Sequence, residues 1–440
     1  MTLTRSPRRS AVWLILLLGA TTAVYLSAGV THAYLAADDF QWLEGGFLFH
    51  WSRVFNQIAG DHFYRPVIDI WFGGATLACG PSPACYHLLN LGLHFVNVAL
   101  VFSLALLLFD DLFIASLGAL MFGIQPGYTQ AVVWISAVTA VLMTTFYVMS
   151  LVFQAISWRR TGTRRVVFEL LAVAAFVAAI FSHEAAMTLP VVSWIMWWLF
   201  APKRLDGRGV MAGGLAAVVA LFAAMTVLAN HRNAVFTESR YAVGTHMIRH
   251  ALDYLVALSV GPGWWLSYSA AVLVVLLLLA ATRATRFGAA WLVISMAPYL
   301  GFTAGNVSRY LYLPSIGFSL GIAAAVAAGG GWLSRRDSSS RASQRMALAG
   351  MLLAALFITV RYARFDVASV RSQVKYLEPW RTFANTLAAN THPSAGTLHV
   401  ALPPGALEDK AADVKIDEMY VDPMAKWVYQ DYGLSVVIDR

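Results

Sequence analysis

The chain has 440 residues, of which 59% are hydrophobic and only 12% are charged. Soluble proteins contain about 25% charged residues, so this composition excludes an ordinary soluble domain and indicates a membrane protein with several spans. The net charge of +8 does not indicate a nucleic-acid partner, because the basic residues lie in short runs between apolar stretches, as in the positive-inside pattern. We therefore expect an integral, multi-pass protein of the cell membrane (inner or plasma membrane), surrounded by membrane lipids.

The first apolar stretch, Ala11–Val30, follows three arginines near the N-terminus. It is longer than the roughly 7–15 apolar residues of a signal peptide, which favours an uncleaved signal anchor over a cleaved signal. Stretches of similar character predict about eleven transmembrane helices, at residues 11–30, 86–109, 112–125, 131–157, 166–182, 185–201, 209–229, 264–282, 287–303, 310–330 and 346–361. With the N-terminus inside, the basic clusters fall in cytoplasmic loops and the C-terminus lies outside.

The first outer loop, residues 31–85, holds the main candidates for chemistry. Asp38 and Asp39 come just after the membrane exit, and Tyr64 and Arg65 follow in the same loop. A carboxylate so close to a membrane is energetically unfavourable unless water solvates it or it has a functional partner. The pair is therefore either a solvated helix terminus, or a general base with a helper that binds a metal or orients an acceptor.

Cys79 and Cys85 end this loop and flank the sequence G-P-S-P-A. The glycine and prolines turn the chain back between them. On the extracytoplasmic side a disulfide is expected, and the alternative is a pair of free thiols.

The second span, 86–109, carries four polar residues at spacings of 3, 4 and 3, which places them on one face of a helix; they are His87, Asn90, His94 and Asn97. For the deeper pair, His94 and Asn97, we favour a structural role in hydrogen bonds between helices over a role in a site. His87, near the outer end, is a better candidate for a site.

Two more outer turns carry charged residues. His183 and Glu184 form a very short hairpin between spans, where the alternative is a solvated turn. Arg309 precedes Tyr310 in a later outer segment. An arginine fork suits phosphate oxygens, although an arginine beside tyrosines is also typical of an anchor at the membrane interface.

The last part of the chain, residues 362–440, is soluble in character. It predicts a helix near Val367–Asn390 and two short strands, in L-H-V-A-L and L-S-V-V-I-D, which together form a small extracytoplasmic α/β appendage to the domain at 1–361. The amphipathic stretch Met247–Val260 is expected as a helix at the outer interface.

Six motifs occur in one order over about residues 30–320. They are D-D at 38–39, Y-R-P at 64–66, Y-H-L-L-N-L-G-L-H-F-V-N at 86–97, Q-P-G-Y-T-Q-A-V-V-W-I-S at 125–136, S-H-E-A-A-M-T-L-P at 182–190 and R-Y-L-Y-L-P-S-I-G-F at 309–318. In this combination the chain resembles the GT-C membrane glycosyltransferases. It is similar to the protein O-mannosyltransferases, in particular their transmembrane-and-tetratricopeptide branch, without the repeats.

This resemblance implies an all-α, GT-C-like membrane domain with an inverting glycosyltransferase activity of the mannosyltransferase and protein-glycosylation type. A sugar would pass from a polyprenyl-phosphate donor to a hydroxyl of a protein or glycan acceptor, on the extracytoplasmic face. Asp38, with Asp39 beside it, would be the base, and Arg65, Arg309 and His183 would bind the donor phosphate. Further site candidates are Tyr64, His87, Glu184 and Tyr310. The lipid-linked sugar is the donor substrate, the resemblance assigns no definite cofactor, and a divalent metal stays open.

The chain departs from the family at several positions. Glutamines stand where the family has a histidine and a glutamate, and His183 stands where it has a lysine; the glutamines are Gln125 and Gln130. Two other interpretations stay open: a transporter or lipid flippase, which would use polar groups at mid-membrane, and an inactive relative that binds a lipid. The clustering of charged residues at the outer ends of the spans favours the enzyme.

Overall fold

A computed structural model describes the chain over most of its length: residues 7–56, 64–202, 214–220, 222–223, 241–259, 268–269, 271–272, 274–275, 282–303, 307–336, 341–394, 397–402, 407–409, 414–433 and 435–439. The spans expected at 209–229 and 264–282 lie largely outside these residues.

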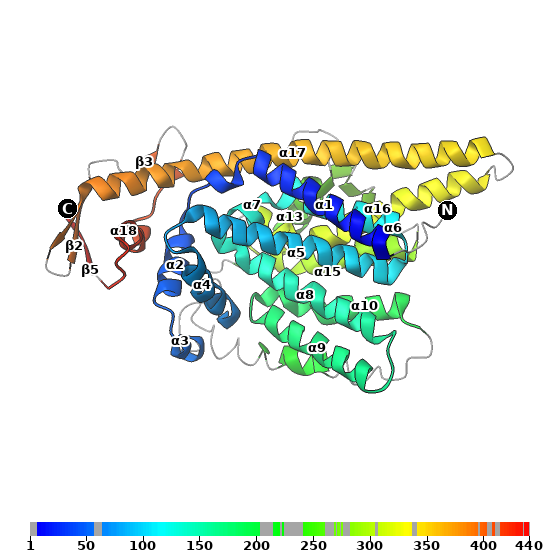
Figure 1. The fold of residues 1–440 in the computed structure, drawn as a ribbon, viewed down its shortest axis with the longest axis horizontal. Coiled ribbons are helices and arrows are strands. Elements are labelled where there is room, and N and C mark those ends of the chain that lie inside the picture. Colours follow the sequence, from blue (N-terminus) through cyan, green and yellow to red (C-terminus); the bar gives the residue numbers. More distant parts are fainter. Residues whose placement is uncertain are drawn as a thin grey trace.

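The molecule is an elongated bundle of helices whose axes run along its long dimension (Figure 1). The bundle consists of α1 (Pro7–Ser27), α5 (Pro83–Phe109), α6 (Leu112–Gly123), α8 (Val138–Ser157), α9 (Gly162–Ile180), α10 (Leu189–Phe200), α15 (Arg283–Leu300), α16 (Tyr312–Arg336) and α17 (Arg341–Asn390). Short helical turns connect them, namely η1 (Val30–His32), η3 (Pro126–Tyr128), α7 (Thr129–Val133), η4 (Ile135–Ala137), η5 (Glu184–Thr188) and η6 (Ser308–Leu311).

The described residues include five helices that are long and apolar enough to cross a membrane, or six if the bent pair of α6 and η3–α7 forms one span. Helices also form at the spans expected at 166–182, 185–201 and 287–303, as α9, α10 and α15. The all-α polytopic class is therefore confirmed, while the number of about eleven spans stays a prediction.

The first outer loop is more regular than expected. Residues predicted as a loop form α2 (Asp38–Phe47), α3 (Trp51–Asn56) and α4 (Pro66–Cys79). A Cβ atom at Gly46 would lie 2.7 Å from the carbonyl oxygen of Phe72, so glycine permits the close contact of α2 with α4. A disulfide between Cys79 and Cys85 joins the end of α4 to the beginning of α5. The segment around the two acidic residues is therefore a packed helical layer.

The polar stripe of α5 forms hydrogen bonds between helices. The Nδ1 atom of His94 lies 2.7 Å from the Tyr312 hydroxyl, and its Nε2 atom lies 3.0 Å from the Gly123 carbonyl oxygen. The side-chain amide of Asn97 donates to the Val141 carbonyl at 2.9 Å and to the Tyr312 hydroxyl at 3.1 Å. These contacts join α5 to α6, α8 and α16, as the structural alternative for His94 and Asn97 predicts.

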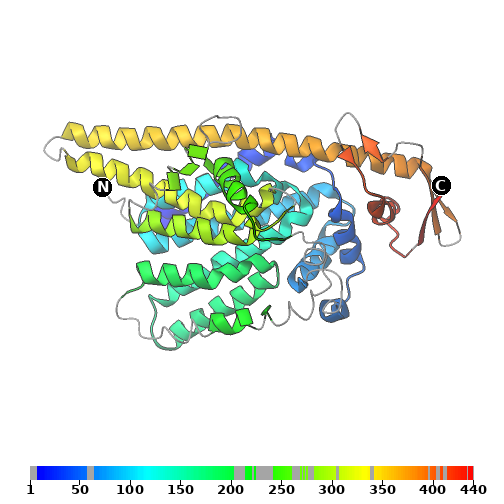
Figure 2. The same cartoon turned by 180° about the vertical axis from the view of Figure 1, so that it is seen from behind.

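The last membrane helix does not end where the apolar stretch ends. The helices expected at 346–361 and near 367–390 are one continuous helix, α17, of 50 residues, which is about 75 Å long. Charged residues from Arg361 to Asp366 mark a change of environment, but they contain no glycine or proline that would end a helix. Both views show α17 running along nearly the whole molecule (Figures 1 and 2), so the boundary expected after residue 361 falls inside it.

The described residues beyond Asn390 form what we call the C-terminal lobe. Both predicted strands are present, as β2 (Thr397–Ala401) and β5 (Ser435–Asp439), which pair in parallel. The strand β1 (Thr391–Ser394) pairs antiparallel with β2. The remaining elements are β3 (Glu408–Asp409), β4 (Val414–Lys415), η7 (Glu418–Tyr420) and α18 (Val421–Tyr429).

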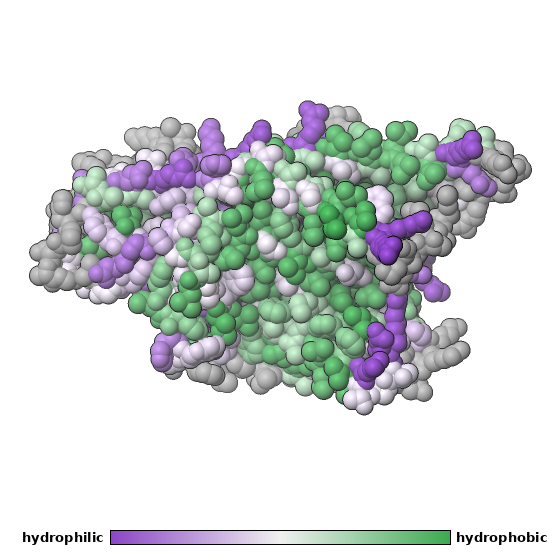
Figure 3. Space-filling view, in the orientation of Figure 1, coloured by the Kyte–Doolittle hydropathy of each residue, from purple (hydrophilic) through white to green (hydrophobic). Residues whose placement is uncertain are grey.

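The amphipathic stretch predicted at 247–260 is α13 (His246–Ser259). It contacts α15 and crosses the bundle on the far face (Figure 2). Apolar side chains cover the middle of the opposite face, whereas hydrophilic ones gather over the C-terminal lobe and at the other end (Figure 3). This is the distribution that a membrane around the middle of the bundle requires.

We expect the beginning of α2 and the C-terminal lobe to face the same side of the membrane. The wild-type chain suits a thiol-labelling test, because its two cysteines form the disulfide. In intact cells, His50→Cys and Met419→Cys should both react with a membrane-impermeant maleimide, and Thr161→Cys, in the turn between α8 and α9, should not. Equal labelling at all three positions, or protection of one or both outer positions, would contradict the expected topology.

Candidate active site

The buried carboxylate of Asp39 fixes the beginning of α2. Asp39 has no exposed surface, and its Oδ1 atom accepts hydrogen bonds from the backbone N–H of Ser136, at 2.7 Å, and from the Ser136 hydroxyl. Its Oδ2 atom accepts from the backbone N–H of Ala36 at 2.9 Å. Burial raises the pKa of Asp39 to about 7, although the hydrogen bonds from Ser136 and Ala36 act in the opposite direction. Since all of these bonds go to the protein itself, Asp39 acts as an anchor.

The residue directly before α2 has an unusual backbone. Ala37 has φ 50° and ψ −122°, a conformation that residues with a Cβ atom rarely adopt. Such strain persists only where neighbouring contacts impose it, and it is common at functional sites. Here the contacts of Asp39 with Ala36 and Ser136 impose it, and they turn the next side chain, Asp38, away from the anchor.

Asp38 is half-buried and lies in the first turn of α2, where the helix dipole favours a negative charge. Its Oδ1 atom accepts a hydrogen bond of 2.8 Å from the hydroxyl of Tyr420 in the C-terminal lobe. The two adjacent acids therefore differ in role: Asp39 is enclosed, and Asp38 remains partly accessible.

An arginine lies beside the same segment of the chain. The guanidinium carbon of Arg309 is 4.8 Å from the centre of the Trp134 ring, and the indole N–H of Trp134 donates to the Ala36 carbonyl at 3.2 Å. Arg309 also donates to the side-chain oxygen of Gln130 at 3.4 Å. Among the described residues no carboxylate forms an ion pair with Arg309, which is half-buried, so its charge is available to an anion.

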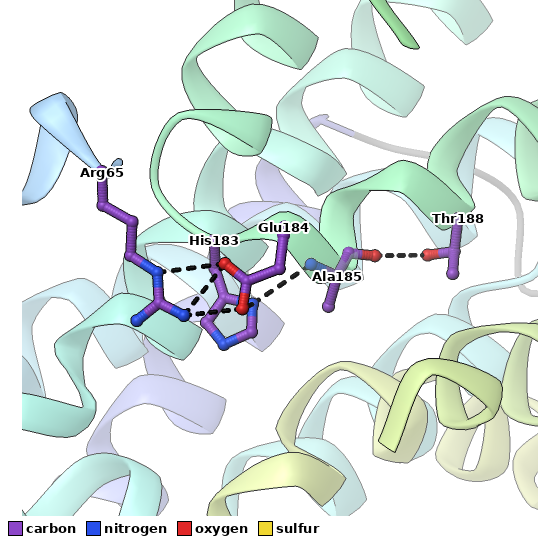
Figure 4. A network of polar contacts seen from close by, with 5 residues as sticks. All are labelled: Arg65, His183, Glu184, Ala185 and Thr188. Atoms are coloured by element: carbon purple, nitrogen blue, oxygen red, sulfur yellow. Dashed lines mark hydrogen bonds and ion pairs between the residues drawn. The ribbon is translucent and has the colours of Figure 1, made fainter. Parts of the chain in front are cut away.

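Arg65 and Glu184 lie face to face across the outer end of the bundle (Figure 4). The Nη2 atom of Arg65 is 2.7 Å from Oε1 of Glu184, and its Nε atom is 3.1 Å from Oε2. This two-pronged pair joins the beginning of α4 to η5. The charge of Arg65 is largely compensated by Glu184, which distinguishes it from Arg309.

His183, in the turn before η5, belongs to the same neighbourhood. Its Nδ1 atom accepts a hydrogen bond from the backbone N–H of Ala185 at 3.1 Å. Burial lowers the pKa of His183 to about 4, and the positive charges of Arg65 and Arg309 act in the same direction. With this pKa His183 is uncharged at neutral pH and can donate through Nε2, and its binding of the donor phosphate stays a prediction.

Two of the remaining candidates, Tyr64 and Tyr310, have structural contacts, and the third, His87, is enclosed. Tyr64 donates its hydroxyl to the Val54 carbonyl at 3.0 Å. Tyr310 stacks on Tyr299 with ring centres 4.5 Å apart, next to Arg309. His87 is fully buried in α5. Within the described part of the chain, no group of three or more His, Cys, Asp or Glu side chains could hold a metal ion.

A scan of protein-family models and a search of curated protein sequences found no match. Solved structures do resemble the chain. The crystal structure of ArnT from Cupriavidus metallidurans bound to undecaprenyl phosphate matches 96% of this chain and 85% of that one, with a TM-score of 0.53 and 12% identity. The oligosaccharyltransferase of Archaeoglobus fulgidus in the apo form matches with a TM-score of 0.54 and 11% identity.

The chain has the GT-C fold of membrane glycosyltransferases. A second crystal structure of the archaeal enzyme, tethered with an acceptor peptide, gives a TM-score of 0.52 at 11% identity. The two archaeal matches include 98% (apo form) and 97% (peptide-tethered form) of this chain. They include only 64% of the archaeal enzyme. The similarity shows the fold, and the O-mannosyltransferase branch stays a prediction from the sequence motifs.

Sequence reasoning missed several residues of this candidate site. Ser136 and Trp134 lie in the W-I-S motif that carries part of the resemblance, so the sequence indicated that this segment matters. It did not indicate which residues they contact. Tyr420 had none, because it lies 382 residues from Asp38 in the chain. Only the folded lobe brings the two side chains together.

We expect Asp39→Asn to change how stability depends on pH. The folded-state pKa of about 7 exceeds the ordinary value of 3.8, so the folded protein binds more protons than the unfolded one between these values. The free energy of unfolding contributed by Asp39 therefore falls as pH rises from about 4 to about 7. Asparagine also faces one of the two backbone N–H groups with its own NH2, which costs about 1–3 kcal/mol.

Thermal unfolding in detergent between about pH 5 and about pH 8 measures this dependence. The wild type should lose more stability over the range than Asp39→Asn does. Parallel curves for the two proteins would show that Asp39 does not titrate in the folded state.

Proposed function

We propose that this protein is an inverting glycosyltransferase that moves a sugar from a polyprenyl-phosphate donor to a hydroxyl group, at the end of the bundle that carries α2. The observation that carries the proposal is that a partly accessible carboxylate, Asp38, lies at the same end of the bundle as Arg309, an arginine that has no acidic partner among the described residues. The anchor Asp39 and the ring of Trp134 connect the two through Ala36 and Ser136. The GT-C fold and the undecaprenyl phosphate bound to ArnT support a lipid-linked donor.

The chemistry follows from the roles of these two charges. The acceptor oxygen attacks the anomeric carbon on the face opposite the phosphate, so the new glycosidic bond has inverted configuration. The bond from the anomeric carbon to the phosphate oxygen breaks, and its electron pair stays on the phosphate. The proton of the acceptor hydroxyl passes to Asp38.

Phosphate is already a good leaving group, so positive charge is more useful than a general acid. Arg309 is the strongest candidate to bind it, because Glu184 compensates the charge of Arg65 and His183 is neutral. The planar guanidinium, stacked on Trp134, would offer two parallel N–H donors to the phosphate oxygens. His183 can add an uncharged hydrogen bond. The donor lipid would then lie along the apolar side of the bundle, and the reaction would take place on the extracytoplasmic face of the cell membrane, with a protein or glycan acceptor.

We expect Asp38→Asn to abolish most of the transfer while the protein stays folded. The amide keeps the shape of the side chain and can still accept the hydrogen bond from Tyr420, but it cannot take a proton at neutral pH. The loss in turnover should be about 10²–10⁴-fold. Glu378→Gln is the matched control, since Glu378 is a half-exposed carboxylate at the same end of the molecule whose partner is Arg381.

Measuring the turnover of the two variants with a defined lipid-linked donor, alongside donor binding, tests whether Asp38 is the base. Activity of Asp38→Asn within a few-fold of Glu378→Gln would remove Asp38 from the chemistry.

Arg309→Lys should weaken both donor binding and turnover, although it keeps the charge. Lysine presents a point charge in place of the two-pronged donor and cannot stack on Trp134 in the same way. We expect a loss of about 10-fold or more, since a hydrogen bond to a charged group contributes about 1.5–3 kcal/mol. Arg249→Lys is the control, because that side chain is 83% exposed on α13. Equal affinity for polyprenyl phosphate in Arg309→Lys, Arg309→Ala and the wild type would make Arg309 a membrane anchor only.

A further inference from the structure

The C-terminal lobe is packed against α2 through an apolar contact. Trp427 of α18 is only 4% exposed, and its ring centre lies 6.4 Å from that of Phe40 and 6.2 Å from that of Phe47. The ring of Tyr432 stacks on Phe47 at 4.6 Å. Burying several aromatic rings in one contact stabilises it through both area and ring geometry. The lobe is therefore fixed to the helix that begins with Asp38.

An ion pair crosses the same contact. The Nζ atom of Lys426 lies 2.8 Å from a carboxylate oxygen of Glu44 on α2 and 2.8 Å from one of Asp422 on its own helix. The side chains of Lys426 and Glu44 are only 14% and 23% exposed, so water screens their attraction less than at an open surface. This pair sets the orientation of α18 on α2.

Tyr420 stands at the end of η7, directly before α18. Its ring packs against Trp380 of α17, with centres 5.7 Å apart, and its hydroxyl donates to Oδ1 of Asp38 at 2.8 Å. Burial and the negative charge of Asp38 raise the pKa of Tyr420 well above its usual value, so the phenol keeps its proton at physiological pH. A permanent donor from the lobe therefore holds one oxygen of Asp38.

We propose that the C-terminal lobe is part of the active site and that Tyr420 is the positioning residue that orients Asp38. This inference rests on the proposed function of Asp38 as the base. By holding Oδ1, Tyr420 leaves Oδ2 for the acceptor, and no described residue donates a hydrogen bond to that atom. The acceptor proton passes to Oδ2, and the Tyr420 proton stays on the phenol throughout.

The C-terminal lobe thereby contributes to the active site although it is far from Asp38 in the sequence. The long helix α17 continues beyond the apolar stretch and brings η7 and α18 to the beginning of α2. Trp427 and Lys426 fix the lobe there, and Tyr420 makes the contact with the reacting group. A surface so close to Asp38 also forms one wall of the space that the acceptor must enter.

The test compares Tyr420→Phe with Tyr429→Phe, a matched change in the same lobe whose hydroxyl bonds to the Ala388 carbonyl at 3.3 Å. Both variants should keep the thermal midpoint of the wild type. We expect kcat of Tyr420→Phe to fall by about 10-fold, with the KM for the donor unchanged, because a hydrogen bond to a charged group is lost from the base and not from the donor site.

A second measurement does not depend on activity. Carbodiimide-dependent coupling of an amine to Asp38, followed by mass spectrometry, should be faster in Tyr420→Phe than in Tyr429→Phe or the wild type. Wild-type rates of transfer and of coupling in Tyr420→Phe would overturn the inference. If coupling accelerates while no protein, including the wild type, transfers sugar from any donor, the contact stands and the proposed function fails.

Discussion

The hydrogen bonds of the buried Asp39 carboxylate are the constraint on which the outer end of this protein depends. They tie the segment before α2 to the turn between α7 and α8, through Ala36 on one side and Ser136 on the other. Ala37 is thereby held in a conformation that it would not adopt alone. The direction of α2, its packing on α4 at Gly46 and the accessible position of Asp38 all follow from this anchor.

The charged residues around the Asp39 anchor differ in burial and in their partners, and these differences indicate which of them can react with a substrate. Two adjacent carboxylates have opposite environments, one enclosed by donors and one partly open, so only one is suited to exchange a proton with a substrate. Two arginines differ in the same way: Glu184 compensates Arg65, whereas Arg309 lies over the Trp134 ring and, among the described residues, donates only to the uncharged amide of Gln130. His183, whose pKa is lowered to about 4 mainly by burial, is close enough to both arginines to be affected by their charges. One accessible base and one available cation are the minimum that transfer from a phosphate-linked sugar requires.

The sequence predicts the class of the fold well, because long apolar stretches and basic loops follow directly from the physics of the bilayer. It also predicts β2, β5 and the hydrogen-bonding role of His94 and Asn97. It does not predict α2, since D-D-F-Q-W-L-E-G-G-F is short, contains two glycines and becomes helical by packing on α4 and α18. For the same reason the sequence does not predict the contacts of Tyr420 and Trp427 with α2 or the Lys426–Glu44 ion pair. No local pattern reports a contact between residues about 380 positions apart, and the change in polarity near Arg361 suggests an end to a helix that in fact continues to Asn390.

The most direct measurement is an assay of the purified full-length protein with a panel of sugars linked to polyprenyl monophosphate, with Asp38→Asn as the blank. If the assigned chemistry is right, one donor in the panel releases polyprenyl phosphate in step with a glycosylated hydroxyl product of the opposite anomeric configuration, and the blank does not. A folded wild-type protein that neither binds nor consumes any of these donors, or a product with retained configuration, would contradict it.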